Sequence, residues 1–414
     1  MTKDLLNIKK YNIIFVALIL SVFIHIRFVT QLVIIRPFDF ITVITFLYLI
    51  FKKEEVKEKI NPGFYYIFPF LIFHSFSALF VSTDNFLRET LQVILIIMFA
   101  FIISGFKSKI NYKKIIYYLL IGSVFLMTFV IVWHIRNNIW VGWKQLPDTR
   151  LLFTTVAIFL FAYLNTIEIS QKHKFKIIIM FIGLFSILLL SGERKALLVF
   201  LFLILMYYTY GFPLRTIIAL VVTYWILVFL ANTIDNVYVA RILNSLLKIT
   251  EGGNIDFTLQ TGIVKAEDSY SNLQRAFAFD ISKEYFLRNP IIGIGTNNFI
   301  LTLNNEHHYL PDFLMVGIHN EFFRIPVENG LVGIFLYLMI WYKSWIRTKE
   351  TLMDAKKNGL INDRQVVFLL YAIYFTLAVY VGTEASSTRS FLILVFISLF
   401  PDYIIYYFKS RVSK

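Results

Sequence analysis

Residues Glu89 to Phe106 read ETLQVILIIMFAFIISGF, a run without a charged side chain after its first position. A helix needs about twenty apolar residues to cross the roughly 30 Å hydrocarbon core of a bilayer. The run is preceded by the short, Lys-poor turn Ser82–Glu89 and followed by a cluster of lysines within 107–114. We therefore expect a membrane-spanning helix whose two flanks differ in charge.

Similar apolar runs recur along the whole chain. Of its 414 residues, 58% are hydrophobic and only 16% charged, against about 45–50% and 25% in soluble domains. The sequence thus predicts an all-α polytopic membrane protein with about twelve transmembrane helices, and ten or eleven would fit the same pattern. The candidate spans are 12–28, 38–51, 63–81, 89–106, 115–134, 151–169, 175–191, 196–210, 213–232, 322–343, 365–382 and 389–407.

Composition also excludes several classes of protein. The net charge of +14 does not indicate nucleic-acid binding, because the basic residues lie in short clusters between apolar runs. The chain has no Cys, which excludes disulfides and thiol nucleophiles. We expect no cleavable signal peptide, because the first apolar run lacks a small-residue cleavage site and further spans follow it.

The basic clusters predict the orientation, because cytoplasmic loops carry the Lys/Arg excess. When loops are counted alternately, one set holds the clusters within 3–10, 52–59, 107–114, 172–176, 347–364 and 409–414. Both termini are therefore expected to be cytoplasmic, and the segment from about Asn232 to Asn320 to lie on the other face. The expected parts are residues 1–231 with helices 1–9, a periplasmic loop 232–320 with active-site elements, and residues 321–414 with helices 10–12.

The long external segment contains one expected helix. Leu273, Phe277, Ile281 and Tyr285 recur at helical spacing. The stripe fits an amphipathic helix on the membrane surface or an ordinary packed helix, and Asn289-Pro290 should end it. A second external loop, 135–150, carries Trp140 and Trp143, as is typical at membrane interfaces.

The first of three polar features is Ser191–Lys195 (SGERK), at the external junction of two apolar runs. Arg194 and Lys195 could snorkel to the headgroups. A basic pair on the outer side, however, breaks the charge rule that the rest of the chain obeys, which favours a functional role.

The second feature is Arg275 followed by the turn Asn289–Phe299 (NPIIGIGTNNF). Pro290 with Gly293 and Gly295 permits a tight turn with exposed N–H groups, either a plain turn or an anion-binding nest. It is not a dinucleotide fingerprint, because the third Gly and the βαβ context are missing.

The third feature is His319-Asn320-Glu321, ahead of Arg324 and Glu328. Histidine is suited to accept a proton near neutral pH, and Arg324 and Glu328 are spaced to pair across a helix face. A metal site of His319 with His307 and His308 is not predicted, because no carboxylate has zinc-site spacing with them.

These residue types suit the transfer of a glycan from a diphosphate. Arginine offers forked donors to phosphate oxygens and keeps its charge when partly buried, so it can stabilise the leaving diphosphate in place of a metal. A nearby His can take the proton from an attacking sugar hydroxyl. At a membrane, the expected donor is a polyprenyl-linked sugar.

In order and spacing, the three features resemble the O-antigen ligase and polymerase superfamily of bacterial envelope glycan assembly. The resemblance rests on SGERKALL at 191–198, on Arg275 to the Gly293-Ile294-Gly295 turn, and on the segment from His319-Asn320-Glu321 to Gly330–Gly333. It covers about residues 185–345.

The resemblance implies an inverting, metal-independent and cofactor-free membrane glycosyltransferase with a glycosyltransferase C-like fold. By analogy, Arg194 and Arg275 engage the diphosphate and His319 activates the acceptor. Further residues that the resemblance suggests for substrate binding are Lys195, Arg288, Asn320, Glu321, Gly293 and Gly295.

The superfamily divides mainly by acceptor. We favour an O-antigen polymerase, which joins undecaprenyl-diphosphate-linked repeat units on the periplasmic face of the bacterial inner membrane. The alternative is a ligase that transfers the polymer to the lipid A core, and a lipid-linked oligosaccharide flippase or transporter ranks third. Implied partners are the lipid-linked donor, the glycan acceptor, membrane lipids, a chain-length regulator and a flippase, with no nucleic acid.

Overall fold

The computed structural model describes residues 2–21, 28–29, 34–51, 65–106, 110–136, 194–208, 267–309, 314–318, 320–382 and 387–412, with a few positions between 215 and 226. The expected spans 151–169 and 175–191, and most of 213–232, lie outside these residues. So do Trp140, Trp143 and His319.

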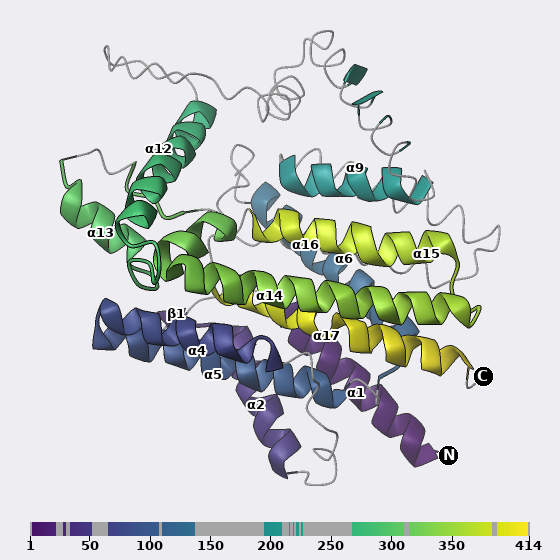
Figure 1. Cartoon of the computed structure of the whole chain (residues 1–414). Helices are drawn as coiled ribbons and strands as arrows, with labels where there is room; N and C mark the ends of the chain where they lie inside the picture. The colour runs from purple at the N-terminus through teal and green to yellow at the C-terminus, as the bar shows by residue number, and fades with distance from the viewer. Residues whose placement is uncertain are drawn as a thin grey trace.

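Long helices lie side by side and form a bundle (Figure 1). The expected spans within the described part of the chain are helical over most of their length. These helices are α1 (Thr2–Ser21), α2 (Pro37–Phe51), α4 (Phe68–Ser77), α5 (Thr83–Phe106), α6 (Tyr112–Arg136), α9 (Arg194–Tyr208), α14 (Glu321–Lys357), α16 (Ile373–Val381) and α17 (Ser387–Val412). The 3-10 turn η1 (Ala78–Phe80) extends α4, and α15 (Asp363–Val367) with the π-helix η4 (Phe368–Ala372) leads into α16.

The expected span 12–28 is wrong in its bounds. Helix α1 ends at Ser21, and β1 (Phe28–Val29) pairs antiparallel with β2 (Ile34–Ile35). The pattern also misses the polar part of α1 before residue 12, because polar residues of a helix can face outward. Lys10 of this part is exposed and donates to the Tyr48 hydroxyl at 2.8 Å.

Helix α14 is likewise longer than the expected span 322–343. It ends only at Lys357, where Gly359 adopts a positive φ of 69° and its N–H donates to the Lys356 carbonyl at 2.9 Å. A glycine in this conformation is a common stop for a helix.

The outer surface of the bundle is strongly apolar. On α14, Leu331, Phe335, Leu338 and Tyr342 are each at least half exposed and lie along one face of the helix. Soluble monomers rarely present such contiguous apolar surface to water. Among the described residues, α5 and α14 are long and apolar enough to cross a bilayer, and six shorter helices are also apolar.

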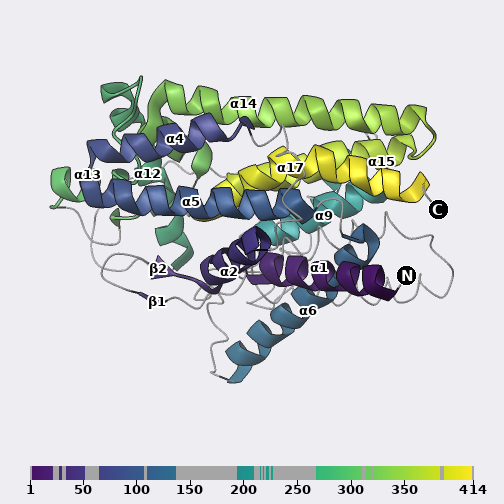
Figure 2. The same ribbon diagram turned by 90° about the horizontal axis from the view of Figure 1, so that it is seen from below.

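Two helices stand at one end of the bundle, beside the start of α14. These are α12 (Glu267–Arg288) and α13 (Phe299–Glu306), whereas α1 begins and α17 ends at the opposite end (Figures 1 and 2). The expected helix through 272–288 is confirmed, as is its end before Asn289-Pro290.

The buried face of α12 decides between the two interpretations of its apolar stripe. Ile281 and Tyr285 pack against Phe299 and Leu303 of α13 and against Val327 of α14. Helix α12 is therefore a packed helix of this end of the bundle.

Candidate functional site

The turn after α12 closes on a break in α14. Helix α14 is interrupted at Gly330, whose φ and ψ are 61° and −162°. A break leaves backbone groups without helical partners, and the turn supplies them. The N–H groups of Leu331 and Val332 donate to the carbonyls of Pro290 (2.8 Å) and Ile291 (3.2 Å).

The turn also donates in the other direction. The N–H of Ile294 reaches the Val327 carbonyl at 2.9 Å, and the N–H of Gly295 reaches the Glu328 carbonyl at 3.0 Å. The N–H of Gly293 donates to the Asn289 carbonyl at 3.0 Å. Of the two alternatives for this segment, these bonds favour the plain turn, because the N–H groups that a nest would offer to an anion are bound to carbonyls of the chain itself.

Glycine is required on both sides of this junction. A Cβ on Gly330 would collide with the backbone of Ile291, and a Cβ on Gly293 would collide with the backbone of Glu328. Both glycines also adopt positive φ, 61° and 75°, where other residues are strained. The paired glycines therefore allow two backbones to approach closely.

A buried polar cluster joins this junction to α4 and α5. All its side chains are less than a tenth exposed. Its members are His74, Ser77, Asn85, Glu89, Thr296 and Asn329.

Asn329 of α14 contacts three other members of the buried polar cluster. Its Nδ2 donates to Ser77 Oγ at 2.6 Å and to Thr296 Oγ1 at 2.9 Å, and its Oδ1 lies 3.2 Å from His74 Nδ1. Thr296 Oγ1 donates to the His74 carbonyl at 2.8 Å. Asn85 Nδ2 donates to the Thr296 carbonyl at 2.6 Å. These bonds fasten the turn to α4 and α5.

Glu89 supplies a fully buried carboxylate to the buried polar cluster. It accepts a hydrogen bond from Asn297 Nδ2 at 2.5 Å, and its Oε2 lies 3.5 Å from His74 Nε2. The half-exposed Arg88 lies 3.5 Å away on the other side. Because ionisable groups are costly in a membrane interior, such a set is a candidate functional or positioning element.

The first turns of α14 contain three further buried charges, those of Glu321, Arg324 and Glu328. The expected pair between Arg324 and Glu328 is not the closest one: Arg324 forms its ion pair with Glu321, at 2.5 Å. The carboxylates of Glu328 and Glu89 act on Arg324 electrostatically. The positive charge of Arg324 thus faces the carboxylates of Glu321 and Glu328 on its own helix and of Glu89 on α5.

Asn320 caps α14. Its side-chain oxygen accepts a hydrogen bond from the Phe322 N–H at 2.9 Å, and its backbone is extended. An Asn in this position satisfies one of the free N–H groups of the first turn. The residue before it, His319, lies outside the described residues.

The expected arginines are placed only in part. Arg194 and Lys195 open α9, and Arg275 lies within α12, but the described structure does not extend to their side chains. Within the described part of the chain, no three His, Cys, Asp or Glu side chains are grouped to hold a metal ion.

Arg288 is held by two carboxylates. It donates to Glu306 at 2.9 and 2.7 Å and to Glu284, and its guanidinium lies over the ring of Tyr285. The hydrogen bonds that Arg288 donates to Glu306 and Glu284 raise its pKa above the ordinary value. Its donors are therefore engaged within the protein.

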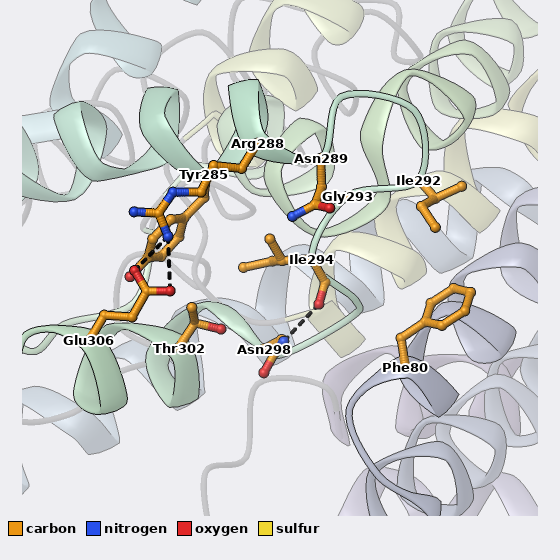
Figure 3. A pocket seen from close by; sticks show the side chains of 10 residues that line it. All are labelled: Phe80, Tyr285, Arg288, Asn289, Ile292, Gly293, Ile294, Asn298, Thr302 and Glu306. Atoms are coloured by element: carbon orange, nitrogen blue, oxygen red, sulfur yellow. Dashed lines mark hydrogen bonds and ion pairs between the residues drawn. The ribbon is translucent and has the colours of Figure 1, made fainter.

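A pocket of about 350 Å³ opens between the end of α12, the turn and α13 (Figure 3). Arg288 and Glu306 line one side, Asn298 and Thr302 the base, and Phe80 of η1 the far side. The pocket thus combines hydrogen-bonding groups with an aromatic wall.

Residues 179–338 match the family model of the O-antigen ligase domain. The match confirms the resemblance that the sequence suggested. It covers less than half of the 414 residues and includes Arg194, Arg275 and His319. Members of the O-antigen ligase family are integral inner-membrane proteins of the ligase/polymerase superfamily. A comparison with curated proteins found no match for the chain.

His74 and Glu89 were not expected as site residues, and they lie outside the matched O-antigen ligase domain. The signal that could have identified them is simple: an ionisable side chain falls in the apolar run 63–81, and another opens the run 89–106. Such residues mark candidate sites in membrane proteins. Their partners in the turn and α14 could not be read from spacing, since Asn329 lies 255 residues after His74.

Proposed function

We propose that this chain is an O-antigen polymerase, an inverting, metal-independent membrane glycosyltransferase. Its donor is an undecaprenyl-diphosphate-linked oligosaccharide repeat unit, and its acceptor is a hydroxyl of a second lipid-linked unit. The reaction takes place on the periplasmic face of the inner membrane. The main support is the junction at one end of the bundle, where α12, the glycine turn and the start of α14 meet.

Each proposed role follows from the chemistry of the side chain. Arg194 and Arg275 bind the two phosphates through forked N–H donors, and Lys195 assists Arg194. His319 accepts the proton of the acceptor hydroxyl as its oxygen attacks the anomeric carbon. The bond from that carbon to the diphosphate breaks, and undecaprenyl diphosphate leaves with the electron pair. Attack opposite the leaving group inverts the anomeric centre.

The described junction supports these roles through positioning. The cap at Asn320 and the ion pair of Glu321 with Arg324 fix the first turn of α14 directly after His319. Gly293 and Gly295 shape the turn that locks this helix in place, and they act on the substrate only through that shape. Arg288, whose donors already bind Glu284 and Glu306, is excluded from the diphosphate role in this proposal.

The shape of the bundle supports the proposed orientation. Helix α1 begins and α17 ends at the end opposite α12 and α13 (Figure 1). Cytoplasmic termini therefore imply that α12 and α13 lie on the periplasmic side, in agreement with the distribution of Lys and Arg.

The test is the lipopolysaccharide banding of a gene-deletion strain complemented with single variants. We expect His319→Ala to abolish the polymer ladder, and Arg194→Lys and Arg275→Lys to shorten it strongly, at unchanged protein abundance. Arg347→Lys, at the Arg347–Asp402 ion pair between α14 and α17, is the matched control and should keep the ladder. A full ladder in His319→Ala would remove the proposed base.

The same deletion separates the alternatives. Core bearing a single repeat unit indicates loss of a polymerase. Core alone, with lipid-linked polymer accumulating, indicates loss of a ligase. Lipid-linked single repeats trapped on the cytoplasmic leaflet indicate loss of a flippase.

A further inference from the structure

The pocket beside Arg288 differs in charge from a diphosphate site. Arg288 contributes one positive charge, and Glu284 and Glu306 contribute two negative charges, which leaves a net charge of −1. Both carboxylates already occupy the guanidinium donors, so a diphosphate would meet repulsion without a free positive partner. An uncharged ligand avoids this penalty.

The position of the pocket also separates it from the proposed diphosphate contact. Arg275 and Arg288 both lie on α12, thirteen positions apart. At 1.5 Å per residue, their backbones are separated by roughly 20 Å. A ligand in the pocket is therefore several sugar residues away from a diphosphate held at Arg275.

The polar groups of the pocket suit sugar hydroxyls. Tyr285 is fully buried under the lining of the pocket, where its hydroxyl interacts with the Glu306 carboxylate. Burial, with a smaller contribution from the Glu306 carboxylate, raises the pKa of Tyr285 to about 12, so the phenol stays protonated and remains a donor. Thr302 and Asn289 add a hydroxyl and an amide to the lining.

The apolar groups of the pocket suit the other side of a sugar ring. Phe80 and Ile292 form the wall opposite the Arg288–Glu306 pair (Figure 3). A pyranose presents C–H groups on its faces and hydroxyls at its edges, so it can contact an aromatic wall and polar groups at once. The volume of about 350 Å³ lies at the lower end of the range of about 300–1,000 Å³ for ligand pockets.

We propose that this pocket is a glycan subsite that binds a neutral sugar ring several residues from the reacting diphosphate. The proposal rests on the proposed function, because it assigns the ring to the glycan that the enzyme transfers or extends. The subsite holds the chain through Thr302, Asn289 and the wall at Phe80, with Tyr285 beneath Glu306, while the bond is made near Arg275 and His319.

The test is a binding measurement on the purified chain in nanodiscs. The probe is the strain's own repeat-unit oligosaccharide, obtained by partial acid hydrolysis of its O-polysaccharide and freed of acidic fragments. Thr302→Trp, which fills the pocket, should weaken binding at least tenfold. Tyr285→Phe, which removes only the hydroxyl that interacts with Glu306, should weaken it about fivefold, because Glu306 loses the support of about one hydrogen bond.

Tyr337→Phe is the matched control. Tyr337 is also buried, but it packs in the core of the bundle and does not line the pocket. It should leave oligosaccharide binding unchanged. Inorganic pyrophosphate, as a second probe, should bind wild type and all three variants equally.

Two results would overturn the subsite. One is wild-type affinity for the oligosaccharide in Thr302→Trp, and the other is loss of pyrophosphate binding in that variant. Because binding is measured without turnover, the subsite can fail while the ladder of the complemented strain stays intact. Conversely, a deletion strain with normal lipopolysaccharide would refute the polymerase proposal whatever the binding results.

Discussion

Gly330→Ala should disable the junction between the glycine turn and α14. At φ 61° and ψ −162° only glycine is relaxed, and another residue is strained by about 1–3 kcal/mol. The new Cβ would also collide with the Ile291 backbone. The turn can relieve this collision only by moving away from α14.

The free-energy cost of moving the turn follows from the hydrogen bonds that the movement breaks. The movement breaks the hydrogen bonds from Leu331 to Pro290 and from Val332 to Ile291, at about 1 kcal/mol each. With the strain, the substitution destabilises the junction by about 3–5 kcal/mol. Since the turn and the start of α14 carry the proposed site, glycan polymerisation should fall with stability.

Gly359→Ala provides the matched control. Gly359 also has a positive φ, 69°, but nothing lies within 4 Å of the position that its Cβ would take. Its substitution should therefore cost only the backbone strain of about 1–2 kcal/mol. The two variants thus differ mainly in the contact with the turn.

The assay compares the variants in the complemented deletion strain and in detergent. Immunoblots give abundance, lipopolysaccharide gels give the polymer ladder, and thermal unfolding of the purified protein gives stability. Gly330→Ala should melt well below Gly359→Ala and lose the ladder. Equal melting temperatures, or a normal ladder in Gly330→Ala, would refute the argument that the close backbone approach holds the site.

Three further changes test the surrounding contacts. Glu89→Leu leaves the Asn297 amide and His74 without their carboxylate and should destabilise the protein by about 3–5 kcal/mol, whereas Glu89→Gln keeps an acceptor and should melt closer to wild type. Asn320→Ala removes the cap of α14 and should cost about 0.5–2 kcal/mol; Asn320→Asp, which retains the acceptor, should restore both the melting temperature and the ladder. The pKa of Tyr285 rises to about 12 in the folded chain, against about 10 in the unfolded chain. Between these values the unfolded chain has lost the phenol proton and the folded chain keeps it, so the free energy of unfolding should fall as the pH rises from 10 towards 12. Melting curves of Tyr285→Phe should show a smaller alkaline loss, and an identical loss would argue against a buried, protonated phenol.

The elements that the sequence predicted well depend on local information. Apolar runs predicted both ends of α2 and α6 within a few residues, because the hydropathy of the side chains is read along the chain itself. Helical spacing and Pro290 likewise predicted α12 and its end. The order of the polar motifs was sufficient to indicate the O-antigen ligase family, which the match over 179–338 confirms.

The tertiary structure decided which of these elements support one another. Nothing in the local sequence joins His74 and Glu89 to Thr296, Asn297 and Asn329, because more than 200 residues separate the partners. Spacing alone suggested Glu328 as the partner of Arg324, whereas the folded chain pairs Arg324 with Glu321. In the sequence, Gly293 and Gly295 predicted a tight turn, and Gly330 belonged only to a family motif. Only the folded chain shows that the turn closes on a break at Gly330. Side-chain hydropathy and backbone propensity act within a segment and so can be read along the chain. Hydrogen bonds between segments exist only after packing has brought them together.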